Sequence, residues 1–349
     1  MSVRDVYEGV GEVLKGLDSV VVGYRREKEI LVASLLADGH VLLEGVPGIA
    51  KTTMVKALAR LMNLNPNEWL EFDGLRYKGF SRIQFTPDLL PGDVTGSLIF
   101  NPRDRRFEPH FGPVFTFLLL ADEINRAVPR TQSALLEAMQ ERQVTIGDTT
   151  YPLEIRDKGK WFLVVATQNP VEQEGTYPLP EAQLDRFMAR ILFSYPETLE
   201  EEKNILRLHS SGLVEPVTRL EPVVEPSWLI GAQEAVASHP VPDGVIDYIT
   251  RLVRATRPEI YKPAARYFTL GASPRAGIAL LRASRALSVI RGEDAVSIES
   301  VKDMVFHILN HRLIPNNDTL VEYEEEHGIY HAKIELIRDG ISYIIENLP

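Results

Sequence analysis

The residues of this chain that could do chemistry begin with a glycine-bearing loop between an apolar run and a helical pattern. The loop follows residues 40–44 and reads Gly45-Val46-Pro47-Gly48-Ile49-Ala50-Lys51-Thr52-Thr53. Glycine permits backbone geometries that aim successive N–H groups at one phosphate, and the start of a helix adds partial positive charge. In such a loop Lys51 reaches the β- and γ-phosphates, and Thr52 offers its hydroxyl to Mg²⁺. Ala50 stands where the strict pattern has glycine, so an ordinary strand–turn–helix is the alternative.

Two adjacent carboxylates follow a second apolar run. Residues 117–121 are all Phe, Leu or Ala, and Asp122 and Glu123 come directly after them. Carboxylates at the end of a buried strand are costly unless they serve a ligand, and ligands bind at the strand tips of parallel sheets. In a nucleoside triphosphatase Asp122 would hold Mg²⁺ through water, and Glu123 would polarise the attacking water. The alternative is a polar strand end that caps a helix.

Three further polar residues could contribute to phosphate chemistry. Asn169 follows the apolar run 161–167 and could orient water against a γ-phosphate, although alone it is typical of a turn before Pro170. Arg186 and Arg275 each follow a polar or small residue in the second half of the chain, and each alone is typical of a surface charge. The order of these residues behind the loop and the carboxylates is more specific than any one of them.

The apolar pattern predicts the elements that must position these residues. Short apolar runs predict buried strands at 40–44, 115–121, 161–167 and, more weakly, 191–193, with a helix over 51–62. Strands separated by helices indicate a doubly wound parallel sheet. Turn centres between apolar ends predict inserted hairpins at 96–107 and 143–151.

From about residue 195 the pattern becomes helical. Apolar spacing and the N-cap residue Ser297 predict the last of these helices, and the predicted helices cover 199–209, 226–237, 243–256, 273–291 and 297–309. We therefore expect an α/β domain over 1–195 with two inserted hairpins, and a helical domain over 196–349 with a helical tail.

The composition limits the classes of protein to which this chain can belong. The chain has 349 residues, a length that favours two domains, and its 38 Lys and Arg against 49 Asp and Glu give a net charge of −11. This balance disfavours a surface built to neutralise many nucleic-acid phosphates. The absence of cysteine excludes disulfides, thiolate metal sites and Cys nucleophiles. Charges within the first ten residues, and apolar runs far below the ~18 residues of a spanning helix, predict a soluble cytoplasmic protein without a membrane span.

Together, these motifs resemble those of the AAA+ ATPases of the helix-two-insert clade, and more narrowly those of the MoxR family. The resemblance runs from about Val21 to Leu313, and the segments that carry it are 45–52, 83–91, 121–127, 132–141, 166–170 and 181–187. It implies an α/β P-loop domain with a parallel sheet, followed by a smaller all-α lid domain. The MoxR loop commonly carries alanine at the position of Ala50.

The resemblance also implies roles for single residues on the nucleotide. Lys51 and Thr52 fall in the Walker A motif, and Asp122 and Glu123 fall in the Walker B motif. Asn169 matches sensor 1. ATP and Mg²⁺ are therefore the expected ligands, with the whole segment 45–53 around the phosphates.

Other roles concern the base, the lid and the neighbouring subunit. Val22 and Gly23 lie where the family frames the adenine, and Arg275 matches sensor 2 of the lid. Arg186 matches the arginine finger that acts on the nucleotide of the neighbouring subunit, and Arg190 is a second candidate. The two hairpins fall where the clade carries its helix-two insert and its pre-sensor-1 insert.

The function that the resemblance implies is ATP hydrolysis in a homo-oligomeric, hexameric ring that remodels or assembles client proteins or inserts their cofactors. The expected partner carries a von Willebrand factor type A domain. The alternatives are a DNA-directed motor, a magnesium-chelatase-like motor subunit, and a scaffold that binds ATP without turnover. Net acidity disfavours the first, and the presence of Glu123 and Arg186 disfavours the last. The segments 63–80 and 318–349 match little, which leaves partner contacts open.

Overall fold

A six-stranded sheet forms the centre of the first half of the computed structural model, which describes residues 1–170, 175–210 and 215–348. The strand order is β10-β1-β9-β6-β3-β2. The strands are β1 (Val41–Glu44), β2 (Trp69–Phe72), β3 (Leu75–Gln84), β6 (Thr116–Asp122), β9 (Leu163–Gln168) and β10 (Ala189–Leu192). All neighbours pair in parallel except β2 with β3. The four predicted buried strands and the parallel sheet are confirmed.

The strands β2 and β3 are the part of the sheet that the apolar pattern does not predict. Within β3, Tyr77 and Ile83 are buried while Arg76, Arg82 and Gln84 are exposed, so polar residues interrupt any apolar run. The register pairs Gln84 with the last residue of β6. The unmatched segment 63–80 is therefore largely an edge hairpin that extends the sheet.

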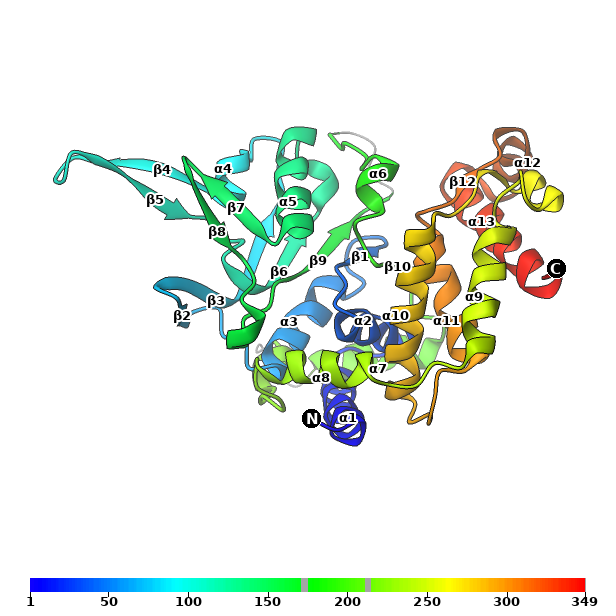
Figure 1. The fold of residues 1–349 in the computed structure, drawn as a ribbon, viewed down its shortest axis with the longest axis horizontal. Coiled ribbons are helices and arrows are strands. Elements are labelled where there is room, and N and C mark those ends of the chain that lie inside the picture. Colours follow the sequence, from blue (N-terminus) through cyan, green and yellow to red (C-terminus); the bar gives the residue numbers. More distant parts are fainter. Residues whose placement is uncertain (171–174, 211–214, 349) are drawn as a thin grey trace.

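Helices cover both faces of this sheet (Figure 1). They are α2 (Arg25–Leu36), α3 (Lys51–Leu61) and α5 (Pro129–Glu141), with the short helices η1 (Ile124–Arg126), η2 (Arg156–Lys158) and α6 (Glu181–Leu184) between strands. The first helix, α1 (Val3–Val20), packs mainly on α3, α10 (Pro274–Ile290) and α8 (Trp228–Ala237). The helices α3 and α5 lie on opposite faces, as right-handed crossovers require when the chain moves along the sheet in opposite directions.

Both predicted hairpins are confirmed. The first consists of β4 (Gly96–Asn101) and β5 (Arg106–Phe111) after the short α4 (Pro91–Thr95), and it extends away from the sheet (Figure 1). The second consists of β7 (Gln143–Ile146) and β8 (Thr149–Pro152). Its turn residue Gly147 has a φ of 62°, and a Cβ there would lie 2.6 Å from the Leu98 side chain. The two hairpins therefore meet at a turn whose positive φ would strain any other side chain.

The second half of the chain is mostly helical. Its elements are α7 (Leu199–His209), η3 (Pro216–Arg219), α8 (Trp228–Ala237), α9 (Asp243–Ala255), η4 (Lys262–Arg266), β11 (Phe268–Leu270), α10 (Pro274–Ile290), α11 (Ile298–Leu309), β12 (Ile314–Pro315), α12 (Asn317–His327) and α13 (Ile329–Glu346). All five predicted helices form, as does the helical tail. The small β11–β12 pair is the departure from an all-α lid.

The segment after α7 returns to the α/β part before the lid begins. Arg60 of α3 donates to the Leu220 carbonyl at 2.5 Å, and Trp161 Nε1 donates to the Pro226 carbonyl at 2.7 Å. The division at residue 195 stays a prediction. Across the described ranges, no helix combines the length and the apolar character needed to cross a bilayer.

Candidate active site

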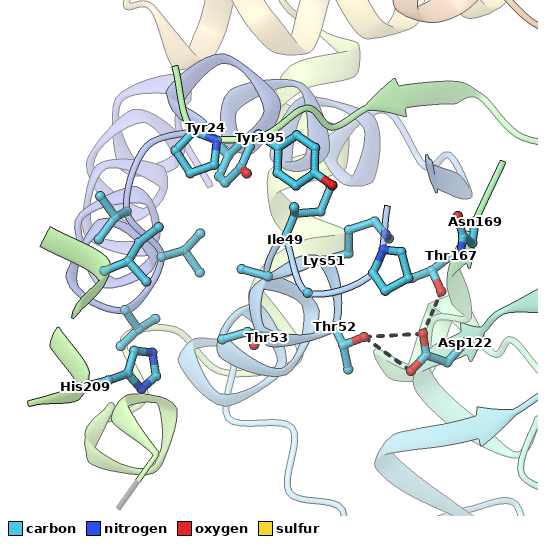
Figure 2. Close-up of a pocket in the computed structure, with 18 of the residues that line it drawn as sticks. Tyr24, Ile49, Lys51, Thr52, Thr53, Asp122, Thr167, Asn169, Tyr195 and His209 are labelled. Atoms are coloured by element: carbon cyan, nitrogen blue, oxygen red, sulfur yellow. Dashed lines mark hydrogen bonds between the residues drawn. The ribbon is translucent and has the colours of Figure 1, made fainter. Parts of the chain in front are cut away.

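A cavity of about 700 Å³ opens at the carboxyl edge of the sheet (Figure 2). Its walls come from the α1–α2 connection, from the loop between β1 and α3, from the ends of β3, β6 and β9, and from α7. Parallel strands that end at one edge bring distant sequence motifs together there. The cavity therefore lies where the strand order predicts a ligand site.

The loop that enters this cavity depends on left-handed backbone positions. Gly48 has a φ of 81° and Ala50 has a φ of 63°. Alanine in this region costs about 1–2 kcal/mol relative to the right-handed region, whereas glycine pays little. The chain thus keeps, with alanine, the backbone shape for which the strict pattern uses glycine, and α3 starts at the next residue with its N-terminus at the cavity.

Lys51 places a positive charge inside the cavity. Its Nζ donates to the carbonyls of Gly45 at 2.5 Å and Val46 at 2.7 Å. Gly45 and Val46 were predicted to bind the nucleotide, but neither residue lines the cavity. Burial lowers the pKa of Lys51, and the nearby carboxylates of Asp122 and Glu123 oppose that shift. The ammonium group is therefore within the field of both acidic residues.

Asp122 is the centre of a hydrogen-bonded group at the end of β6. The residue is only 6% exposed. Its Oδ1 accepts from Thr167 Oγ1 at 2.6 Å, and Thr52 Oγ1 donates from 3.3 Å (Figure 2). Its Oδ2 accepts from Arg82 Nε at 3.0 Å and Nη2 at 2.7 Å. A buried carboxylate is thereby fully partnered.

The oxygens of Thr52 and Asp122 suit Mg²⁺. This ion prefers hard oxygen donors and is usually held by one or two protein groups together with substrate phosphates. A hydroxyl and a carboxylate 3.3 Å apart, beside the loop, match that requirement. In the part of the chain that the structure describes, no three His, Asp or Glu side chains form an all-protein metal site.

Glu123 has a strained backbone and a held side chain. Its φ is 56°, in the left-handed region that is uncommon outside glycine and clusters at functional sites. Its Oε2 accepts from Gln84 Nε2 at 2.8 Å and from Arg126 Nη1 at 2.9 Å. Its N–H donates to Thr167 Oγ1 at 2.9 Å. The Thr167 hydroxyl therefore joins the two adjacent acidic residues.

Asn169 lies beside this group and lines the cavity (Figure 2). Its carbonyl accepts from Asn125 Nδ2 at 3.2 Å, which ties the end of β9 to η1. The structure thus brings Lys51, Thr52 and Asn169 together with the two carboxylates, as the sequence predicted.

The other end of the cavity is apolar. Val22 and Tyr24 line it from the α1–α2 connection, and Ile205 and Leu206 line it from α7. Gly23, although predicted here, does not line the cavity, and a Cβ on it would lie 3.0 Å from Glu201 Oε1 of α7. This end has the apolar walls that suit a nucleobase.

The three arginines that sequence analysis singled out lie outside the cavity. Arg190 pairs with the buried Glu44, with Nε 2.9 Å from Oε2, and its side chain is 12% exposed. Arg275 is 60% exposed and its Nη1 lies 3.3 Å from Asp185 Oδ2. Arg186 is half-buried, and its side chain makes no hydrogen bond or ion pair with any residue that the structure describes. The roles of Arg186 and Arg275 stay predictions.

Four residues complete the site without having been predicted. Arg82 and Gln84 come from the unrecognised strand β3, Thr167 is a hydroxyl inside an apolar run, and Arg126 follows the carboxylates in η1. The register of β3 with β6 is the signal that would have found the first two, because it places Gln84 level with Asp122.

Comparisons with known proteins agree with this geometry. Residues 40–189 match the family model "ATPase family associated with various cellular activities (AAA)", and residues 262–327 match the AAA lid domain model. The chain is 42% identical over 306 residues to Chaperone MoxR1 of Mycobacterium tuberculosis, covering 87% of this chain and 75% of that protein. It is 41% identical over 311 residues to the uncharacterized protein YeaC of Bacillus subtilis, covering 89% and 88%.

A solved structure shares the whole architecture. It is a candidate ATPase from Cytophaga hutchinsonii, with 39% identity, a TM-score of 0.82, and coverage of 99% of this chain and 96% of that chain. The expected fold of a P-loop domain with a parallel sheet and a helical lid is therefore confirmed.

Proposed function

Because the chain belongs to the MoxR family of AAA+ ATPases, we propose that it hydrolyses ATP in the cavity described above to remodel other proteins, as a ring of identical subunits. ATPase activity itself follows from family membership. The ring, its hexameric size and the client are the proposed part. An ATP-driven remodeller needs the nucleotide pool of the cytoplasm, and we place the protein there.

In this proposal the phosphates lie against the loop and the start of α3. The N–H groups of residues 48–53 and the helix N-terminus attract phosphate oxygens, and Lys51 turns from the loop carbonyls to the β- and γ-phosphates. Thr52 and Asp122 would hold Mg²⁺, which neutralises phosphate charge when it is bound. The apolar end around Val22 takes the base.

Glu123 is the residue we assign to water activation. Its carboxylate stands at the strand tip, beside Lys51 and Asn169, and can accept a proton from a water aimed at the γ-phosphate. Gln84 and Arg126 fix its orientation, and Thr167 fixes its backbone. Asn169 would orient that water with its side-chain amide.

Arg186 carries the proposal that the site is shared between subunits. Its side chain is half-buried, lies outside its own cavity and has no partner among the described residues, so its charge is available to another chain. Arg190 is less suited to this role because it is bound to Glu44. An arginine finger contributes roughly 10³–10⁵ in rate by stabilising charge on the transferring phosphoryl group.

Mixing two inactive variants tests the shared site. Arg186→Ala and Lys51→Ala chains should each be nearly inactive, and mixing them should restore part of the ATPase activity at interfaces that join an intact loop to an intact finger. Arg251→Ala, which removes an exposed arginine of α9 paired with Asp247, is the matched control and should keep full activity. Full activity of Arg186→Ala alone, or of a chain that stays monomeric with ATP, contradicts the proposal.

For the client we propose a protein with a von Willebrand factor type A domain. A relative at 42% identity is named a chaperone, which favours remodelling over a DNA-directed motor or a magnesium-chelatase-like subunit. Because nucleotide state changes the angle between the α/β part and the lid, such a partner should bind more tightly with ATP than with ADP. Equal affinity in both states, measured by titration of the purified partner, rejects nucleotide-controlled remodelling of it.

A further inference from the structure

We propose that Arg312, in the turn that follows α11, is a positioning residue that holds Arg186 in the place from which it serves the neighbouring subunit. This inference rests on the proposed shared site. Arg312 does not line the cavity and its side chain is 3% exposed, so it acts through the backbone around Arg186.

The guanidinium of Arg312 binds the chain on both sides of Arg186. Its Nε donates to Asp185 Oδ1 at 2.7 Å. Its Nη2 donates to the carbonyls of Phe187 at 2.6 Å and Asp185 at 3.3 Å, and its Nη1 donates to the Met188 carbonyl at 2.9 Å. A buried, charged donor group that is satisfied by four acceptors around one residue fixes that residue's backbone.

The two residues before Arg312 bind the same segment. Asn310 Nδ2 donates to the Arg190 carbonyl at 3.0 Å, and a ring nitrogen of His311 lies 3.0 Å from the Phe187 carbonyl. Three consecutive residues of the lid thus hold the stretch between α6 and β10. Arg186 stands within that stretch with its side chain unengaged by the described residues.

Asp185 extends this connection to the start of α10. Its second carboxylate oxygen lies 3.3 Å from Arg275 Nη1, so one carboxylate bridges two arginines of the lid. A lid that moves with the nucleotide of its own subunit would therefore move the segment that carries Arg186. Positioning matters here because a displacement of about 1 Å at a catalytic group can cost about 10²-fold in rate.

The mixing assay separates positioning from general stability. Arg312→Met keeps most of the side-chain length but removes the donors, and we expect it to lower ATPase activity about 10²-fold on its own. Mixed with Lys51→Ala, it should recover activity because its intact loop meets an intact finger. Mixed with Arg186→Ala, it should not, because neither chain presents a correctly held finger.

Arg291→Met is the matched control. Arg291 is a lid arginine, 30% exposed, whose Nη1 lies 2.7 Å from Asp303 Oδ2, away from Asp185. Arg291→Met should give an active mixture with Lys51→Ala and also with Arg186→Ala.

The mixing results test the shared site and the positioning role of Arg312 separately, although the second rests on the first. If Lys51→Ala and Arg186→Ala do not complement each other, the shared site itself is wrong. If they do, but Arg312→Met restores activity with Arg186→Ala, or fails with both partners while folded, the positioning role is overturned. Should Arg312→Met not fold, Asp185→Asn decides, because it keeps the shape and weakens the same contact. Asp185→Asn should complement Lys51→Ala better than it complements Arg186→Ala, and equal behaviour overturns the proposal.

Discussion

His40, the residue before β1, should make the fold sensitive to acid. Its ring joins two other elements at the amino edge of the sheet, with Nε2 3.0 Å from the Met139 carbonyl and Nδ1 3.0 Å from the Val164 N–H. An N–H can only donate, so Nδ1 is unprotonated and Nε2 carries the hydrogen. Burial, and then the charge of Arg142, lower the pKa of His40 to about 3. The folded protein therefore holds a neutral imidazole.

The sign and size of the effect on stability follow from the different proton binding of His40 in the folded and unfolded chains. Below a pH of about 6.5 the unfolded chain binds a proton at His40 that the folded chain does not, so stability is lost as the pH falls from about 6.5 toward about 3. At about 1.4 kcal/mol per pH unit, lowering the pH to about 5 removes about 2 kcal/mol through this one residue. His307 and His311 are also buried with lowered pKa values and add losses of the same sign.

Urea denaturation near pH 7.5 and near pH 5 measures this loss of stability, with tryptophan fluorescence, to which the buried Trp161 contributes, as the signal. His40→Gln keeps one donor and one acceptor but cannot titrate, so its free energy of unfolding should fall less between the two pH values, by about 2 kcal/mol. His110→Gln, at an exposed position of β5, is the control and should follow the unmutated protein. The same pH dependence in His40→Gln and in the unmutated protein would show that His40 does not cause the loss of stability in acid.

Three further substitutions test other parts of the structure. Ala50→Val should destabilise the loop by about 2 kcal/mol and weaken ATP binding, because a β-branched residue at a φ of 63° is strained, whereas Ala50→Gly should bind ATP normally in the same titration. Lys160→Met should lower the free energy of unfolding in urea by about 1–3 kcal/mol, because it removes the side-chain nitrogen that donates to three backbone carbonyls. Thr167→Val should lower kcat about tenfold and stability by about 1–3 kcal/mol, since it removes the hydroxyl between Asp122 and Glu123; an unchanged kcat would reject that role.

Apolar continuity explains what could be predicted from the sequence. The strand β6 is buried at every position, and its residues 117–121 form one apolar run that ends just before Asp122. In β3 only one face is buried along most of its length. The charged residues on the other face interrupt the apolar pattern, so the sequence does not predict this strand. For this reason the loop and the carboxylates were predictable, whereas Arg82 and Gln84, which hold those carboxylates, were not.

Residues that act across long distances could not be placed from the sequence. The contribution of α7 to the cavity depends on how the chain folds back after β10, and the contacts of Arg312 join residues 127 positions apart. Arg186 and Arg275 were assigned from the family resemblance as arginine finger and sensor 2, and in the proposed ring their positions relative to the nucleotide depend on a neighbouring subunit and on the lid. The spacing of residues along one chain gives the position of neither the neighbouring subunit nor the lid.

The substitution Glu123→Gln tests whether Glu123 activates water for ATP hydrolysis in this cavity. The variant keeps the side-chain shape and can still accept from Gln84, so the fold and ATP affinity should change little. ATP affinity and steady-state turnover are measured side by side for this variant, the unmutated protein and Lys51→Ala. We expect Glu123→Gln to bind ATP within about threefold of normal while kcat falls by roughly 10²–10⁴, the usual contribution of a general base, and Lys51→Ala to lose binding itself. Turnover by Glu123→Gln at the unmutated rate contradicts the account.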